Sequence, residues 1–278
     1  MADRRRKKRW VIGLLLVAVF GAGFLLGRIA VPSRKAPPPP RIVKARIAIV
    51  LDDWGYNLKQ VPALGRIHQP LTVSVLPNLP FSTRVARAAH AGGHEVILHM
   101  PMEARDSRAP REAGTLLTRM SREEVLQSLG RSLATVPFAR GLSNHQGSKG
   151  TADRALMETV LGDLKRRGLF FLDSRVTEES VCRQVAGRLN LRFAQRAVFL
   201  DNDKSPEAIR ARLAELAKVA ERNGGAVGIG HDRGATLQVL EERIPALEEA
   251  GYQFVPVSDL TEVPRNGARI NPGTADKT

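Results

Sequence analysis

Short apolar runs alternate with amphipathic segments along most of this chain. The runs are rich in Val, Ile and Phe, are bounded by turn residues and have the length of buried strands. The seven clear ones are Ile47–Leu51, Leu71–Leu76, Val96–Leu98, Leu169–Leu172, Val198–Leu200, Ala226–Ile229 and Phe254–Val257, and Arg140–Ser143 is a weaker eighth candidate. Strands that alternate with helices in this way are typical of a parallel sheet with the helices outside it.

Two of the intervening segments carry N-terminal helix signals. Ser121–Ala134 begins with a serine that is followed three residues later by Glu124, which is a capping box. Pro206–Arg222 is preceded by Ser205 as N-cap and has proline in its first turn. Both an open doubly wound sheet and a (β/α) barrel agree with the alternation. We favour a distorted or incomplete barrel.

The positive charge of the chain is concentrated before the first predicted strand. The whole chain carries a net charge of +15, of which residues 1–46 account for +11 and residues 47–278 for only +4. A nucleic-acid-binding domain would need a strongly basic surface of its own. The nearly balanced charge of the folded part therefore argues against nucleic acid as a partner.

The first 27 residues have the pattern of a membrane anchor. Residues 1–9 are basic, and residues 10–27 contain no charged side chain. Eighteen helical residues reach about 27 Å, which is enough for a bilayer core. Basic residues before an apolar run stay in the cytoplasm. We therefore expect one transmembrane helix in the inner (cytoplasmic) membrane, with the C-terminal domain outside the cytoplasm.

Two other interpretations of the apolar run stay open, a cleaved signal peptide and a buried core helix. The arginines lack the rest of a twin-arginine export pattern. Residues 28–45 contain four consecutive prolines, Pro37–Pro40, and are predicted to be an extended linker. The folded domain is predicted over residues 46–260, with a loose polar tail over 261–278. The single cysteine, Cys182, excludes an internal disulfide.

Polar residues follow the C-terminal ends of five predicted strands. In a barrel of parallel strands these ends meet at one mouth, where barrel enzymes have their active sites. Five sets at equivalent positions predict a functional site. The sets are Asp52–Tyr56, His99–Glu103, Asn144–Ser148, Asp173–Arg175 and His231–Arg233.

The aspartate pair has two interpretations. It is either a solvated turn in which Asp52 caps a helix, or a pair in which one carboxylate binds a divalent cation while the other acts as general base.

Among the six histidines, His99, His145 and His231 lie at predicted strand ends. Each alone is best read as a hydrogen-bonded structural histidine. Together with Asp53 they favour a mononuclear metal site with mixed His/Asp ligands.

These motifs resemble polysaccharide deacetylases with the NodB-type barrel, and they are most similar to the divergent polysaccharide deacetylase branch. The resemblance runs through Ile47–Leu260, which is nearly all of the predicted domain. The motifs that carry it are Ile49–Gly55, Leu98–Glu103, Asn144–Ser148, Phe171–Arg175 and Ile229–His231.

The resemblance implies a role for each residue of the predicted metal site. Asp52 corresponds to the catalytic base and Asp53 to a metal ligand. The family pattern His-x-x-x-His begins at His99, but Glu103 stands where the second histidine belongs. We assign the vacant ligand position to His145, with Glu103 as the less favoured oxygen ligand. Zinc suits a His/His/Asp set best, and other divalent ions stay open.

The resemblance also implies roles for residues beside the metal. His231 corresponds to the general acid, Asp173 is expected to orient a site histidine or the substrate, and Arg175 is expected to stabilise a developing oxyanion. The chain is thus expected to be a metal-dependent hydrolase that removes acetyl groups from an N-acetylated carbohydrate of the cell envelope. The alternative is a weak or inactive deacetylase-like envelope protein that binds glycan or a protein partner. The sequence does not determine the oligomeric state.

Overall fold

The computed structural model describes residues 43–265 of the 278-residue chain. The predicted basic segment 1–9 and membrane helix 10–27 lie outside the described residues, as do most of the predicted linker and tail. Within 43–265, none of the helices has both the length and the apolar character that crossing a bilayer requires.

The described residues form one sheet of nine strands, in which all neighbouring strands are parallel. The order is β6-β5-β4-β3-β2-β1-β8-β7, with β9 paired to the start of β1. The end strands β6 and β7 are not paired to each other, so the curled sheet is an incomplete barrel, as the sequence predicted. The strands are β1 (Ala45–Trp54), β2 (Thr72–Val75), β3 (Glu95–Met102), β4 (Gly141–Gln146), β5 (Phe170–Asp173), β6 (Phe193–Gln195), β7 (Val198–Phe199), β8 (Gly225–His231) and β9 (Tyr252–Phe254).

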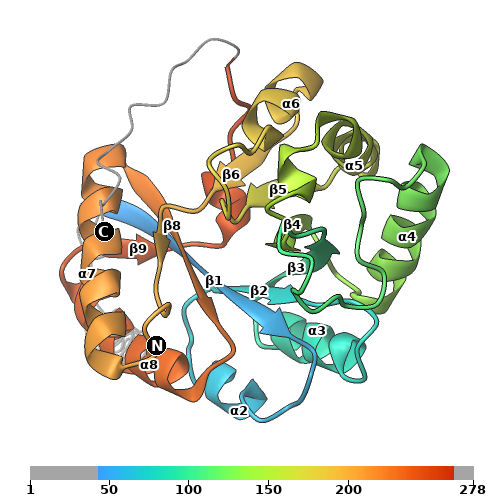
Figure 1. Ribbon diagram of the computed structural model, residues 1–278. Helices are drawn as coiled ribbons and strands as arrows, with labels where there is room; N and C mark the ends of the chain where they lie inside the picture. The colour runs from blue at the N-terminus through green and yellow to red at the C-terminus, as the bar shows by residue number, and fades with distance from the viewer. Residues whose placement is uncertain (1–42, 266–278) are drawn as a thin grey trace, which may run out of the picture. The chain divides into compact units, whose positions relative to one another are not determined.

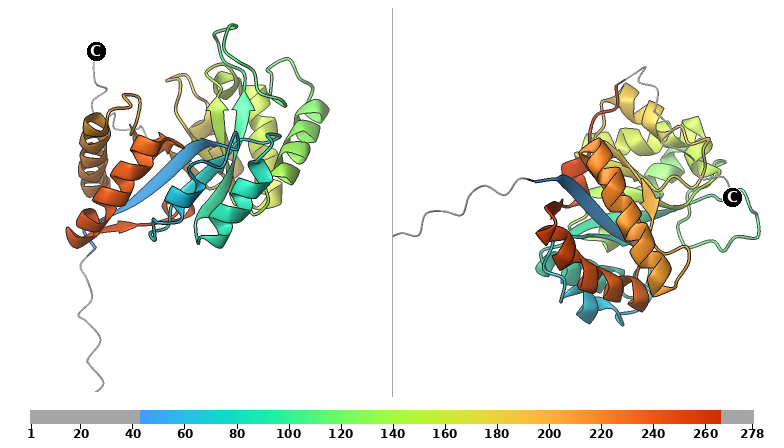
Figure 2. Two further views of the ribbon diagram at one scale, coloured as in Figure 1. Left: turned by 90° about the horizontal axis from the view of Figure 1, so that it is seen from below. Right: turned by 90° about the vertical axis from the view of Figure 1, so that its left-hand side faces the viewer.

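Helices cover the outside of the curled sheet (Figure 1). Two further views show the long helices beside the strands, with α7 packed against β8 and β1 (Figure 2). The α-helices are α2 (Val61–Leu64), α3 (Ser82–Ala91), α4 (Arg122–Thr135), α5 (Arg154–Arg167), α6 (Cys182–Leu189), α7 (Pro206–Asn223) and α8 (Gly234–Glu249), and the 3-10 helices are η1 (Gly150–Ala152) and η2 (Val257–Leu260).

Alternation along the strands divides the apolar side chains into two cores. On β1, Ala48 and Val50 belong to the smaller core inside the barrel, whereas Ile47, Ile49 and Leu51 belong to the larger core between sheet and helices. Successive side chains of a strand point to opposite faces, so each strand supplies both cores. The same alternation decides which polar residues enter the barrel mouth.

Most of the predicted strands and helices are confirmed, and the weak candidate Arg140–Ser143 corresponds to β4. The capping box at Ser121 is formed, and Ser205 caps α7. Two details differ. Phe193–Gln195 is a strand that the sequence did not signal, because three residues give too short a pattern. The predicted strand Phe254–Val257 divides into the end of β9 and the 3-10 helix η2.

Candidate metal and catalytic site

Two consecutive aspartates face the barrel mouth because β1 is irregular at its end. Asp52 continues the inward series of Ala48 and Val50, so the next residue would face outward in a regular strand. Instead, Asp53 has φ 68°, and the pairing register with β2 shifts between Leu51 and Trp54. Irregularities of this kind re-aim side chains beside active sites. The local strain thus brings both carboxylates to the same site.

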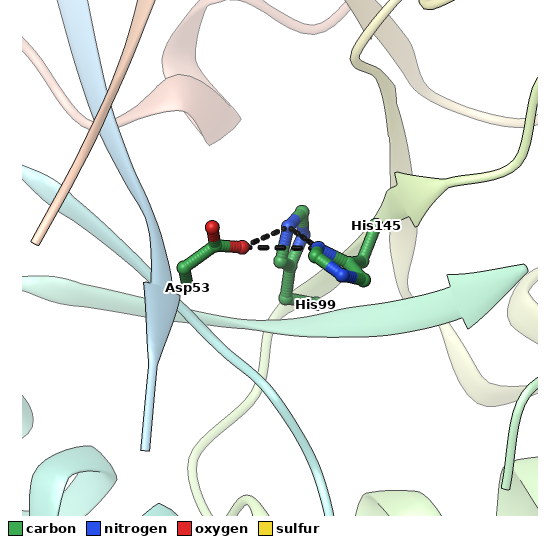
Figure 3. A group of neighbouring side chains, drawn as sticks. All are labelled: Asp53, His99 and His145. Carbon is green, nitrogen blue, oxygen red and sulfur yellow. Dashed lines mark hydrogen bonds and ion pairs between the residues drawn. The ribbon is translucent and has the colours of Figure 1, made fainter. Parts of the chain in front are cut away.

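Asp53, His99 and His145 converge at this mouth from β1, β3 and β4 (Figure 3). Asp53 Oδ1 lies 3.3 Å from His99 Nε2 and 3.0 Å from His145 Nδ1, and the two ring nitrogens are 3.3 Å apart. His99 and Ser143 are paired across β3 and β4, and His145 follows two residues later, on the same face. The structure therefore brings together the three residues that the sequence grouped as ligands.

The spacing of these three atoms fits a metal ion. Donors at 2.0–2.1 Å from a tetrahedral zinc lie about 3.3 Å from one another. Asp53 Oδ1 is also buried without a hydrogen-bond partner among the described residues, which is costly unless something else satisfies it. The donor set of two imidazoles and one carboxylate suits zinc.

The electrostatics differ between the two aspartates. Burial alone would raise the pKa of Asp53, but the adjacent rings of His145 and His99 lower it well below its usual range. Asp52 is 3% exposed, and its burial raises the pKa of the carboxyl despite the opposing charge of His99. Asp52 Oδ2 lies 3.6 Å from His99 Nε2. One carboxylate is thus held ionised, and the other holds a proton more readily.

His231 lies on the other side of the aspartate pair. Asp52 and His231 are direct neighbours in the pairing of β1 with β8, and His231 Nε2 is 3.8 Å from Asp53 Oδ2. Its Nδ1 is 2.7 Å from Asp201 Oδ1. Burial alone would lower the pKa of His231, but the hydrogen bond and negative charge of Asp201 raise it above its usual value.

Further polar groups line the rim of the mouth. Burial and the negative charge of Asp53 raise the pKa of Asp232 to about 7. Tyr56 is 46% exposed, and its hydroxyl donates a hydrogen bond to Glu112. The charges of Asp53 and Asp232 both act on Tyr56, which places this aromatic ring beside the site.

Comparison with known proteins identifies the family of this chain and supports its fold. The family model described as divergent polysaccharide deacetylase matches residues 49–261. The chain belongs to this family. It is 34% identical over 234 residues to the uncharacterized protein YibQ of Escherichia coli, a match that covers 84% of this chain and 73% of YibQ.

Two solved structures share the fold of this chain. The crystal structure of an uncharacterized protein from Agrobacterium tumefaciens is 25% identical, with a TM-score of 0.75 over 81% of this chain and 92% of the other. The catalytic domain of a peptidoglycan N-acetylglucosamine deacetylase from Eubacterium rectale is 16% identical, with a TM-score of 0.53 over 87% of this chain and 99% of the other. At that identity, the second likeness shows the fold alone.

Glu103, the alternative oxygen ligand, is not part of the cluster. Its carboxylate accepts hydrogen bonds from the backbone and hydroxyl of Thr118 and from Lys149 Nζ. These bonds outweigh burial and lower the pKa of Glu103 to about 2. β3 ends at Met102, so the chain has already left the strand where the family pattern has its second histidine. The structure therefore contradicts Glu103 as a ligand.

Asp173 and Arg175 also differ from the expectation. Asp173 accepts hydrogen bonds from the Ser180 hydroxyl and the Arg175 backbone, and the Arg175 guanidinium pairs with Glu178. Phe171 faces the helices, and Leu172 faces the barrel interior. Because side chains alternate along a strand, Asp173 lies on the same face as Phe171. Asp173 therefore does not orient a site histidine. The oxyanion role of Arg175 gains no support from its contacts.

Asp201 has the role that was expected of Asp173, although the sequence prediction did not include it. It is fully buried, and besides the His231 ring it accepts hydrogen bonds from the His231 backbone and the Thr236 hydroxyl. A signal was available, because Asp201 directly follows the predicted strand Val198–Leu200. Its position at a strand end is therefore equivalent to those of the residues that the sequence did indicate.

Proposed function

We propose that this protein is a metal-dependent hydrolase that removes acetyl groups from an N-acetylated carbohydrate of the cell envelope. The observation that carries the proposal is the convergence of Asp53, His99 and His145, with Asp52 and His231 on either side of them. A site of three ligands with a carboxylate and a supported imidazole beside it matches the needs of hydrolytic metal catalysis.

Asp53, His99 and His145 would hold the metal. When bound there, a divalent ion such as zinc would polarise the amide carbonyl and lower the pKa of water. The other residues would move the protons. Asp52 would accept the proton of the attacking water, for which its raised pKa suits it, and His231 would donate a proton to the leaving amine nitrogen. The products are acetate and a free amino sugar.

Membership of the deacetylase family supports a carbohydrate substrate. The exposed ring of Tyr56 at the rim offers an apolar face and a polar tip, which suits a sugar ring. The proposed location is outside the cytoplasm, with residues 10–27 as a single-pass anchor in the inner membrane, where an envelope glycan is within reach. A reporter fused after Thr278 would test this location, and reporter activity in the cytoplasm would contradict it.

Asp52→Asn tests the proposed chemistry. Asparagine keeps the size of the side chain but cannot take up the proton, so acetate release should fall about 10²–10⁴-fold. Metal content and folding should stay near those of the wild type. The measurement is acetate release from N-acetylated envelope glycan together with bound metal.

Asp53→Asn is the matched control, one residue away and with the same chemical change. A neutral amide is a poorer ligand than a carboxylate, so this variant should lose metal as well as activity. Acetate release that is unchanged in Asp52→Asn would contradict the role of Asp52 as base. A wild type that binds metal and glycan but releases no acetate would favour the alternative of a non-catalytic envelope protein.

A further inference from the structure

A line of two hydrogen bonds runs through the barrel interior from His99 to Ser74. His99 Nδ1 lies 2.7 Å from the Ser143 hydroxyl, which lies 2.8 Å from the Ser74 hydroxyl. Three side chains from three adjacent strands are thus connected beneath the metal cluster.

The strand register explains why these residues meet. Ser143 on β4 is the direct partner of His99 on β3. Ser74 on β2 is the partner of Ile97, which lies two residues before His99 on the same inward face. Both serines are fully buried, and His99 and Asp52 are 2% and 3% exposed. Solvent therefore has no ready access to replace a missing hydroxyl.

The direction of these bonds follows from what a metal requires of the ring. An ion at Nε2 takes the lone pair of that nitrogen, so the ring hydrogen lies on Nδ1 and is donated to the Ser143 oxygen. A serine hydroxyl has a single hydrogen, and that of Ser143 is then available for the Ser74 oxygen.

This direction matters for the other nitrogen of the ring. A neutral imidazole carries hydrogen on one nitrogen and a lone pair on the other. With hydrogen on Nδ1, the lone pair of His99 lies on Nε2, which faces Asp53 at 3.3 Å and His145 at 3.3 Å. Hydrogen bonds to the far nitrogen of a ligating histidine fix its tautomer and its orientation in metal sites.

We propose that Ser143 and Ser74 are positioning residues that hold His99 with its hydrogen on Nδ1 and so prepare Nε2 to bind a metal. The inference rests on the metal site of the proposed function and does not depend on which substrate is hydrolysed. Ser143 acts directly on the ring, and Ser74 acts through Ser143.

Zinc affinity of the metal-free full-length chain tests this role, measured by competition with a chelator. Ser143→Ala should bind zinc about 10–100-fold more weakly, as is typical when the partner of a ligating histidine is removed. Ser74→Ala should weaken binding in the same direction but less. The double variant should bind no more weakly than Ser143→Ala alone, because the line of bonds is already broken.

Ser128→Ala is the matched control. Ser128 is also buried, at 3% exposure, and its hydroxyl donates to the Gly114 carbonyl in a part of the fold outside the metal cluster. This variant should lose stability but keep its zinc affinity within about twofold. Equal affinities of Ser143→Ala and Ser128→Ala would overturn the proposal.

A second measurement needs no variant of the serines. In the zinc-loaded wild type labelled with ¹⁵N-histidine, NMR should find the hydrogen of His99 on Nδ1, and finding it on Nε2 would overturn the proposal. Weaker zinc binding by Ser143→Ala in a chain that releases no acetate would support the positioning role and contradict the proposed function. A wild type without zinc affinity would contradict the metal site and, with it, this positioning role.

Discussion

Two histidines at the barrel mouth share a geometry but differ in what supports them. Both turn Nε2 toward the Asp53 carboxylate, at 3.3 Å for His99 and 3.8 Å for His231. Both use Nδ1 for a hydrogen bond of 2.7 Å, which His99 makes to the neutral hydroxyl of Ser143 and His231 makes to the carboxylate of Asp201.

The difference indicates that the two histidines have different roles. A hydroxyl orients a ring without adding charge, which suits a ligand that must keep a lone pair for a metal. A buried carboxylate stabilises the imidazolium, which suits a ring that must carry a proton. The raised pKa of His231 follows from this support. The support at Nδ1 therefore distinguishes the proposed ligand from the proposed acid.

The largest expected effect comes from removing each ring in turn. His99→Gln should abolish tight metal binding and, with it, acetate release. His231→Gln should keep the metal and lose about 10²–10⁴-fold in rate, as expected for a missing general acid. Metal content and acetate release of the two purified variants separate the roles. Loss of metal from both would mean that His231 is also a ligand, and the comparison would fail.

A smaller effect is expected when the charge behind His231 is removed. Asp201→Asn takes away the group that raises the pKa of His231, so this pKa should fall. A general acid must be protonated, so activity is lost as the pH rises through its pKa. The alkaline limb of the pH–rate profile should therefore move to lower pH, with metal affinity unchanged. The profile should not move if the Asp201 carboxylate merely packs against the ring.

The smallest effect on the site is expected at Glu103. Glu103→Gln should leave zinc affinity within about twofold of the wild type, whereas a true ligand would lose far more. The variant should still be less stable at neutral pH, by about 1–3 kcal/mol, because charge-assisted hydrogen bonds to Thr118 and Lys149 are weakened.

The stability loss in Glu103→Gln should depend on pH. The folded-state pKa of Glu103 is about 2, against an ordinary value of 4.5. The ionised form therefore stabilises the fold fully above about pH 4.5, and this contribution is lost as the pH falls toward 2. Denaturant unfolding of both proteins across this range should bring the two stabilities together at low pH. A constant difference would contradict the assignment.

Residues with a local signal were predictable from the sequence. Runs of Val, Ile and Phe located the strands, and polar residues after them located the mouth, including the three converging side chains. The face on which a strand-end residue lies depends on the exact position at which the strand ends. The prediction for Asp173 was wrong because its side chain lies on the face of the sheet toward the helices. Ser74 and Ser143 gave no signal, because a serine inside a strand becomes informative only when pairing register places it beneath His99.

The three converging side chains are spread evenly along the chain, since 46 positions separate Asp53 from His99 and again His99 from His145. In a His-x-x-x-His pattern, two ligands are neighbours even before the chain folds, and an unfolded chain can already capture an ion. Here the unfolded ensemble has no such local chelate. Binding to the unfolded state subtracts from the stabilisation that a ligand gives. This arrangement would therefore let almost the whole affinity for an ion act as thermodynamic linkage that favours the native state.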